Sequence, residues 1–249
     1  GDRAGLSGLQ AQYDQQLAGD VGLRVETSGG VVLFEQAATD GTDVVTTLDP
    51  GIQSAAEESL AAAELKVPGA IVAVHVPTGE VLAAANSPSN GFDRALTGRY
   101  PPGSTFKVIT TAAALRDGVD PNIRLTAARS ITLPGSTATL TNYGHQTRPG
   151  AAGGTVTLAQ ALQYSCNTAF VDLVVNKLKQ PETTLAETAK RFGLDEATPA
   201  IPLPVRAKST LGDVSDRAAL GQSAIGQYNV RMSAPQNAII AATVAHGGV

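Results

Sequence analysis

Two residues of the sequence, Ser104 and Lys107, have the types and the spacing of a nucleophile and its base. They lie in the run YPPGSTFK at residues 100–107, which is followed by apolar residues at helical spacing. Because residues three apart on a helix share a face, Lys107 can direct its amine at the Ser104 hydroxyl. A hydroxyl is a weak nucleophile until a neighbouring base takes its proton. The pattern therefore predicts a nucleophilic serine with a lysine base.

Lysine acts as a base only when its pKa is lowered. Burial disfavours the ammonium form, and so does the positive end of a helix. Both conditions hold if the helix that Ser104 opens belongs to the core, so we expect a neutral Lys107 in the resting site. The same helix N-terminus offers backbone N–H groups to an oxyanion. Standing alone, however, a Ser-x-x-Lys sequence is common, and a capped helix with an incidental lysine also explains it.

A second polar group, Ser165-Cys166-Asn167, lies between two stretches with helical patterns. Residues two apart do not face each other on a helix, so the backbone must break here if Ser165 and Asn167 are to reach one cleft. Ser165 could then relay a proton to a leaving amine, and Asn167 could hold a substrate amide through its donor and its acceptor. The alternative is a polar joint in which Asn167 caps a helix starting at Thr168, while Thr157 caps the preceding helix. Cys166 is expected to be a small buried filler.

The two motifs together are much rarer than either alone, and such a set is shared by penicillin-binding proteins and class A β-lactamases. Nearly the whole chain resembles class B penicillin-binding proteins, most of all the actinobacterial members. The resemblance is carried by residues 5–17, 46–53, 69–85, 100–115, 165–171 and 223–227. It implies that Ser104 is the acylated nucleophile, Lys107 its base, and Ser165 and Asn167 the second motif.

The family's third motif, Lys-Thr-Gly on a sheet strand, is absent from the 249 residues. The near match, Lys208-Ser209-Thr210, lacks the glycine that lets substrate lie close to the strand. It also precedes residues 223–227, whereas the family's third motif follows that segment, so we reject it. We expect the motif, and the strands that would complete the sheet, to lie beyond Val249 in a longer parent protein.

Local signals predict the elements that would hold these residues. A strand is expected at residues 44–48, and Asp49 followed by Pro50 marks the start of a helix. This helix should end near Ala63 and bury three apolar side chains, Ile52, Ala56 and Leu60. A hairpin follows, with arms at residues 70–76 and 81–85 around a turn at 77–80. Its first arm is almost entirely apolar, which is typical of a central strand covered on both faces.

The rest of the chain divides into an N-terminal segment and a helical part. Residues 6–17 have the spacing of an amphipathic helix, and residues 24–36 that of a hairpin. Beyond Thr105 the chain reads as mostly helical, with helices near residues 108–115, 158–164, 168–177, 183–192 and 235–245. Glycines stand at expected C-caps, at Gly118, Gly193 and Gly247.

The resemblance implies an α/β fold of the penicillin-binding-protein and β-lactamase type, incomplete in this chain. A sheet flanked by helices would lie beside an all-helical lobe, with the site in the cleft between them. Residues 1–42 would be the remnant of a non-catalytic head and linker. Residues 43–249 would be the N-terminal part of the transpeptidase domain.

Composition excludes several other classes of protein. The net charge is −4 and no basic run occurs, which argues against nucleic acid as a partner. One cysteine rules out an internal disulfide, and no apolar stretch reaches the roughly 18–20 residues of a membrane span. The three histidines lack metal-ligand spacing, and no Gly-x-Ser-x-Gly motif occurs. We expect no metal or organic cofactor. Residues 142–144, Asn-Tyr-Gly, resemble a class D β-lactamase motif in the wrong order and are interpreted as a turn.

The reaction implied by the resemblance is transpeptidation of peptidoglycan. Ser104 would attack the D-Ala-D-Ala bond of a stem peptide on a lipid II-derived glycan strand, and β-lactams would acylate the same serine. The expected partner is a glycosyltransferase of the divisome or elongasome. The expected place is the extracytoplasmic face of the membrane, with an anchor in an N-terminal segment absent from this chain. The alternatives are a β-lactamase or β-lactam sensor on the same fold, or a non-catalytic scaffold.

Overall fold

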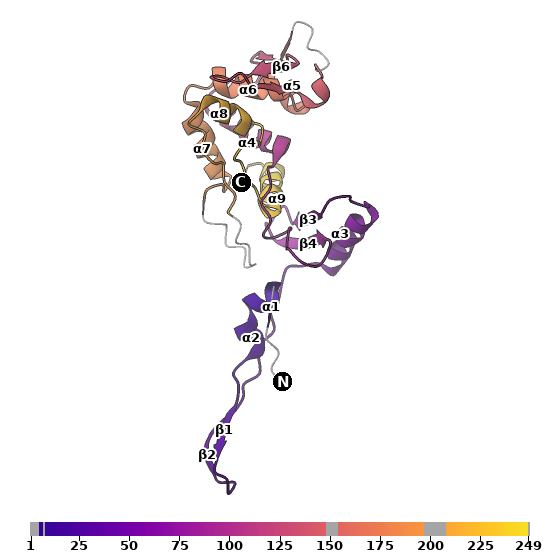
Figure 1. The fold of residues 1–249 in the computed structure, drawn as a ribbon, viewed down its shortest axis with the longest axis vertical. Helices are drawn as coiled ribbons and strands as arrows, with labels where there is room; N and C mark the ends of the chain where they lie inside the picture. Colours follow the sequence, from indigo (N-terminus) through magenta and orange to yellow (C-terminus); the bar gives the residue numbers. More distant parts are fainter. Residues whose placement is uncertain (1–4, 7, 148–153, 197–207, 249) are drawn as a thin grey trace.

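The protein is elongated, and most of the helices that follow Thr105 in the sequence are gathered toward one end, in what we call the helical lobe (Figure 1). The computed structural model describes residues 5–6, 8–147, 154–196 and 208–248. The hairpin of β1 (Leu23–Glu26) and β2 (Val32–Gln36) lies at the far end from the helical lobe. The hairpin of β3 (Gly69–Val74) and β4 (Val81–Ser87) lies between them with α3 (Pro50–Ala62) (Figure 1).

The N-terminal segment forms two short helices and a hairpin. Residues expected as one amphipathic helix form α1 (Gly8–Gln12) and α2 (Asp14–Ala18), which are separated at Tyr13. The predicted hairpin is confirmed as β1 (Leu23–Glu26) paired antiparallel with β2 (Val32–Gln36). Every residue of both strands is exposed, so this hairpin adds nothing to the buried core of the described chain.

Helix α3 (Pro50–Ala62) starts as the sequence predicts. The Asp49 side chain accepts a hydrogen bond from the Ile52 backbone N–H at 2.9 Å, and Pro50 takes the first helical position. Ala56 and Leu60 are buried as expected, but Ile52 is 38% exposed, so its predicted burial is wrong. The strand predicted at residues 44–48 is also wrong. That segment has no strand ladder. It is tied to β4 by a hydrogen bond from Thr47 Oγ1 to Val81 O, and the next residue, Asp49, donates its N–H to Leu82 O.

The hairpin of β3 (Gly69–Val74) and β4 (Val81–Ser87) is antiparallel and two-stranded. Alternate residues of β4 are buried, and Ala83 and Ala85 pack with Ala56 and Leu60 of α3 in a small core. Helix α9 (Ala234–Ala245) packs against β3. Every residue of β3 nevertheless stays partly exposed, so the prediction of a doubly covered central strand is wrong for the described residues. The physical reason is that β3 pairs there with β4 alone.

The helical stretches predicted after Thr105 are confirmed within a few residues. They are preceded by a 3-10 turn, η1 (Gly103–Phe106), and the glycines at the three predicted C-caps all have positive φ. The helices are α4 (Lys107–Arg116), α5 (Leu158–Gln163), α6 (Asn167–Asn176), α7 (Pro181–Arg191), α8 (Arg217–Ser223) and α9 (Ala234–Ala245). None of the described helices is long and apolar enough to cross a membrane.

The helical lobe contains the main hydrophobic core, with α6 at its centre. Seven consecutive or nearly consecutive residues of α6 are buried, and Phe170 and Leu173 are inaccessible to solvent. The lobe is not all-helical as expected. It also contains two small antiparallel ribbons: β5 (Leu125–Thr126) with β8 (Thr155–Val156), and β6 (Ser130–Thr132) with β7 (Thr139–Thr141). The first pair buries Leu125 and Val156 in the core, and the second buries Leu140. This burial anchors both short ribbons to the helices.

Candidate active site

The turn that carries Ser104 is fixed by its neighbours on both sides. Ser104 itself is exposed in η1, while Phe106, two residues later, is fully buried and anchors the turn in the core. The Gly103 N–H donates to the Gly226 carbonyl at 2.9 Å. The helix expected to open at Ser104 therefore begins as a 3-10 turn, and regular α-helix starts at Lys107.

The amine of Lys107 lies at the centre of the site although the residue is completely buried. Its Nζ is 3.1 Å from Ser104 Oγ, which confirms that the two side chains share a helix face. It is also 2.9 Å from Ser165 Oγ, 2.8 Å from the Ser165 carbonyl oxygen and 2.6 Å from Asn167 Oδ1. The structure thus brings all four predicted site residues together around one nitrogen atom.

The backbone breaks between α5 and α6, as two side chains aimed at one cleft require. Ser165 has a φ of +53°, in the left-handed region that non-glycine residues rarely adopt. Helix α5 is set by a capping box of Thr157 and Gln160, as predicted for Thr157. The predicted capping role of Asn167 is wrong: Cys166 occupies the N-cap position of α6 and Asn167 is the first helical residue. The reason is that the Asn167 side chain is turned toward Lys107.

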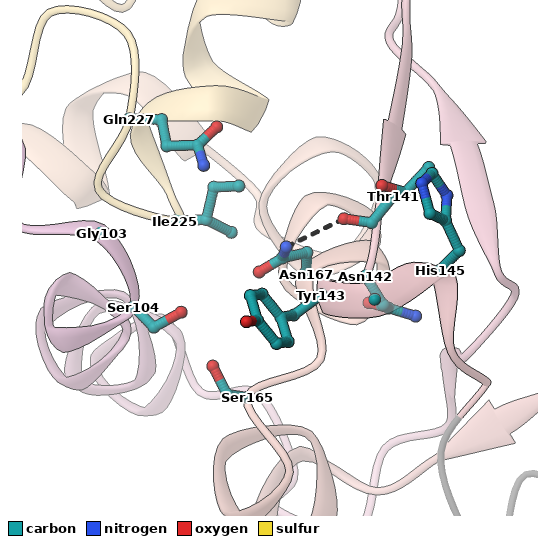
Figure 2. Close-up of a pocket in the computed structure, with 11 residues that line it drawn as sticks. Gly103, Ser104, Thr141, Asn142, Tyr143, His145, Ser165, Asn167, Ile225 and Gln227 are labelled. Carbon is teal, nitrogen blue, oxygen red and sulfur yellow. Dashed lines mark hydrogen bonds between the residues drawn. The ribbon is translucent and has the colours of Figure 1, made fainter.

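The side-chain amide of Asn167 is held at both ends. Its Oδ1 faces Lys107, and its Nδ2 donates to the Thr141 carbonyl at 2.9 Å, the contact drawn in Figure 2. Because the donor is committed to a backbone carbonyl, the amide orientation is fixed without reference to a ligand. One Nδ2 hydrogen remains for a substrate carbonyl, since a side-chain amide has two.

A cavity of about 590 Å³ opens in front of these residues, within the size range of ligand sites. Figure 2 shows Ser104, Ser165 and Asn167 facing it from η1, from the joint before α6 and from α6 itself. The lining comprises Gly103, Ser104, Thr141, Asn142, Tyr143, Gly144, His145, Ser165, Asn167, Ile225 and Gln227. No Asp or Glu is among these described residues.

One wall of the cavity was missed by sequence reasoning. Residues 142–144 were interpreted as a turn, and the turn is confirmed: Asn142 directly precedes η2 (Tyr143–His145), in which Gly144 has a φ of +63° and His145 a φ of +54°. No pattern in the sequence predicts that this turn faces Ser104, because the turn is distant from both motifs along the chain. The turn-forming residue types at 142–144 predict a turn but do not predict its place in the cavity wall.

Two further predictions concern Cys166 and the rejected sequence Lys208-Ser209-Thr210. Cys166 is fully buried, as expected for a small filler. Ser209, the centre of the rejected Lys-Ser-Thr sequence, is buried away from the cavity and accepts from the Ser233 N–H. Within the described residues no group of three or more His, Cys, Asp or Glu side chains could hold a metal ion.

The sequence profile of the penicillin binding protein transpeptidase domain matches residues 69–249, so the chain belongs to that family of proteins. Among curated relatives it is similar to the peptidoglycan D,D-transpeptidase PbpA of Mycolicibacterium smegmatis. The identity is 41% over 237 residues, covering 84% of this chain and 47% of the relative. It is also 30% identical over 217 residues to the peptidoglycan D,D-transpeptidase FtsI of Escherichia coli, covering 79% of this chain and 35% of that protein.

Solved structures agree with the sequence relatives. The imipenem acyl-enzyme complex of penicillin-binding protein A from Mycobacterium tuberculosis superposes with a TM-score of 0.77 at 41% identity, covering 84% of this chain and 53% of that one. The predicted α/β penicillin-binding fold is thereby confirmed. The chain spans about half the length of the curated relatives it matches.

Proposed function

We propose that this chain forms part of a serine D,D-transpeptidase that cross-links peptidoglycan stem peptides. The observation that carries the proposal is the Lys107 amine, buried and within 3.1 Å of oxygen atoms of Ser104, Ser165 and Asn167 at the edge of an open cavity. The names of the relatives support the same reaction, since they are called peptidoglycan D,D-transpeptidases.

Acylation would begin with the Ser104 hydroxyl. Its oxygen attacks the carbonyl carbon of the bond between two D-alanines, and its proton passes to Lys107 Nζ, 3.1 Å away. The tetrahedral oxyanion would meet the Ser104 backbone N–H, which has no partner within its own turn because it lies at the start of η1. When the carbon–nitrogen bond breaks, the proton returns through Ser165 Oγ, 2.9 Å from Nζ, to the departing D-alanine amine.

Deacylation would reverse these steps with a new amine. The amine of a neighbouring stem peptide attacks the ester carbonyl and loses a proton toward Ser165 and Lys107. The new amide bond forms as the ester bond breaks, and the Ser104 oxygen regains a proton from Lys107. A β-lactam would react with Ser104 at the first step. The attack breaks the carbon–nitrogen bond of the ring, but the amine stays attached to the acyl group and cannot depart.

The absence of acidic residues from the described lining favours a transpeptidase over a β-lactamase. Hydrolytic deacylation needs a base to activate water, and a carboxylate is one such group. Within the described part of the cavity neither Asp nor Glu is present. We therefore propose that a β-lactam adduct on Ser104 is long-lived.

We also propose where and with what the protein works. Stem peptides to be linked lie outside the membrane, so the protein should act at the extracytoplasmic face, tethered by an N-terminal anchor. A reaction that polymerises glycan strands must supply the substrate, so the partner would be a glycosyltransferase of the divisome or elongasome. Labelling of the domain by a membrane-impermeant reagent in intact spheroplasts tests the location, and in-cell cross-linking tests the partner. No labelling, or no glycosyltransferase among the products, would contradict these two proposals.

The main proposal is tested by incubating the full-length natural protein with a fluorescent penicillin and mapping the adduct by mass spectrometry. We expect one adduct, on Ser104, that persists for many minutes. Ser104→Ala should abolish labelling and leave the melting temperature nearly unchanged, because one small exposed side chain replaces another. An adduct on Ser165 or Cys166 would refute the assignment, and rapid loss of the label would favour a β-lactamase.

A further inference from the structure

The side chain of Asn142, which lies between β7 and η2, makes more contacts than a turn residue needs. It is 2% exposed, and its Nδ2 donates to the carbonyls of Ala128 and Gln146 at 3.0 and 3.1 Å. Its Oδ1 accepts from the Thr168 backbone N–H at 3.2 Å and from Cys166 Sγ at 3.5 Å. Asn142 thus ties the cavity wall to the N-terminus of α6, 26 residues further along the chain.

The contact with Thr168 has the geometry of a helix cap supplied from elsewhere in the fold. The first N–H groups of a helix have no partner inside it and are usually satisfied by the side chain at the N-cap. In α6 that position is held by Cys166, which makes no side-chain cap hydrogen bond. Asn142 Oδ1 accepts from Thr168, the second residue of α6, which is where an N-cap side chain would accept.

The active-site motif explains why the cap is not local. Ser165 and Asn167 both reach Lys107, so the side chain between them points the other way, toward Asn142. Asn167 would be a good cap, but its Oδ1 is committed to Lys107. Because the side chains of Ser165 and Asn167 both contact Lys107, the N-terminus of α6 has to be capped by a residue from elsewhere in the fold. Asn142 is that residue.

We infer that Asn142 is a positioning residue, which holds the Ser165–Asn167 joint at the distance that Lys107 requires. This inference rests on the proposed function, because it assigns Asn142 to the same acyl-transfer site. Two neighbouring contacts act in the same direction: Thr141 O orients the Asn167 amide, and Thr168 Oγ1 donates to Ala128 O at 2.9 Å. The strained φ of Ser165 also needs surroundings that fix it.

The test measures β-lactam acylation by the full-length protein carrying Asn142→Ala. A shift of about 1 Å in a reacting group can cost about 100-fold in rate. We expect the maximal acylation rate, kinact, to fall about 10- to 100-fold while the half-saturating concentration, KI, changes less than about threefold. A raised KI with unchanged kinact would overturn the inference, because it would make Asn142 a ligand contact.

A matched control separates positioning from loss of stability. Thr188→Ala also removes a buried hydroxyl contact, but on α7, where Thr188 is bonded to Thr184 and Arg116 away from the cavity. We expect it to lower the melting temperature without lowering kinact. If kinact falls equally in both variants, Asn142 has only a structural role.

Two further measurements keep the inference testable. Hydrogen exchange of a peptide covering residues 164–170 should be faster in Asn142→Ala than in the wild type. This measurement does not depend on acylation. Unchanged exchange would refute the capping role of Asn142. A wild type that is not acylated would instead refute the proposed function. If the alanine variant does not fold, Asn142→Asp decides, since it keeps the acceptor for Thr168 and loses both donors. We expect slowed kinact with retained exchange protection, and fast exchange there would overturn the inference.

Discussion

At the scale of residues, the site depends on how the hydrogens of one amine are shared. The Ser165 carbonyl and Asn167 Oδ1 can only accept, so each takes an N–H of Lys107. A neutral amine has two N–H groups and one lone pair. In a neutral Lys107 these two acceptors would use both N–H groups, and the lone pair could take a proton from Ser104 or Ser165, whose Oγ atoms lie 3.1 and 2.9 Å from Nζ. The same four oxygen atoms would also accept from an ammonium, so the neutral state of Lys107 that a base requires stays a prediction.

The base role of Lys107 predicts the behaviour of two variants. Lys107→Arg keeps a positive charge but cannot give up a proton, and Lys107→Met keeps the length without the amine. Both should lower kinact/KI for a penicillin by about 10²- to 10⁴-fold, the usual worth of general base catalysis. The Arg variant should also lose stability, because the larger head group has to fit a fully buried position. Near-normal acylation by either variant would rule out the base role.

At the scale of elements, sequence signals succeeded where they are local. Asp49 before Pro50, Thr157 before Gln160 and the glycine C-caps all act within a few residues of the helix they begin or end. The start of α6 was misplaced by one residue because the side chain that accepts from its N-terminus is that of Asn142, between β7 and η2. The site residues were found through their spacing, whereas the wall at residues 141–145 required the fold.

Gly226 is an element-scale requirement that connects the segment after α8 to the nucleophile turn. Its φ is +72°, and a Cβ there would lie 2.1 Å from the Gly103 carbonyl oxygen. We predict that Gly226→Ala displaces the Ser104 turn and lowers the acylation rate at least about tenfold, in addition to destabilising the protein. Labelling kinetics and thermal melting measure the two effects.

The hairpin turn offers the control for this variant. Gly79 has a similar φ of +74°, but a Cβ there would meet nothing within 4 Å. Gly79→Ala should therefore cost only the conformational strain, about 1–2 kcal/mol, and leave acylation unchanged. If the two variants acylate alike, close approach at Gly226 does not position Ser104.

At the scale of the whole molecule, the described residues form two separate hydrophobic cores. The large core is in the helical lobe. It includes Cys166 of the Ser165–Asn167 joint and Phe106 next to Lys107, so it holds both motifs of the site. The small core joins α3 to β3 and β4. The sequence predicted these elements but not the exposure of β3, because strand periodicity does not say how many neighbours a strand has. The division at residues 42 and 43 stays a prediction.

Two cores of unequal size predict two units of local unfolding. Leu60 is 7% exposed in the small core, and Leu173 is fully buried at the centre of α6. Replacing a buried leucine by alanine costs about 2–5 kcal/mol. In Leu60→Ala we expect faster hydrogen exchange in α3, β3 and β4 only. In Leu173→Ala we expect it in α4, α6 and α8 together, with slower acylation because α6 carries Asn167 at its first turn. Exchange that spreads from the Leu60 variant into α6 would show one cooperative unit instead.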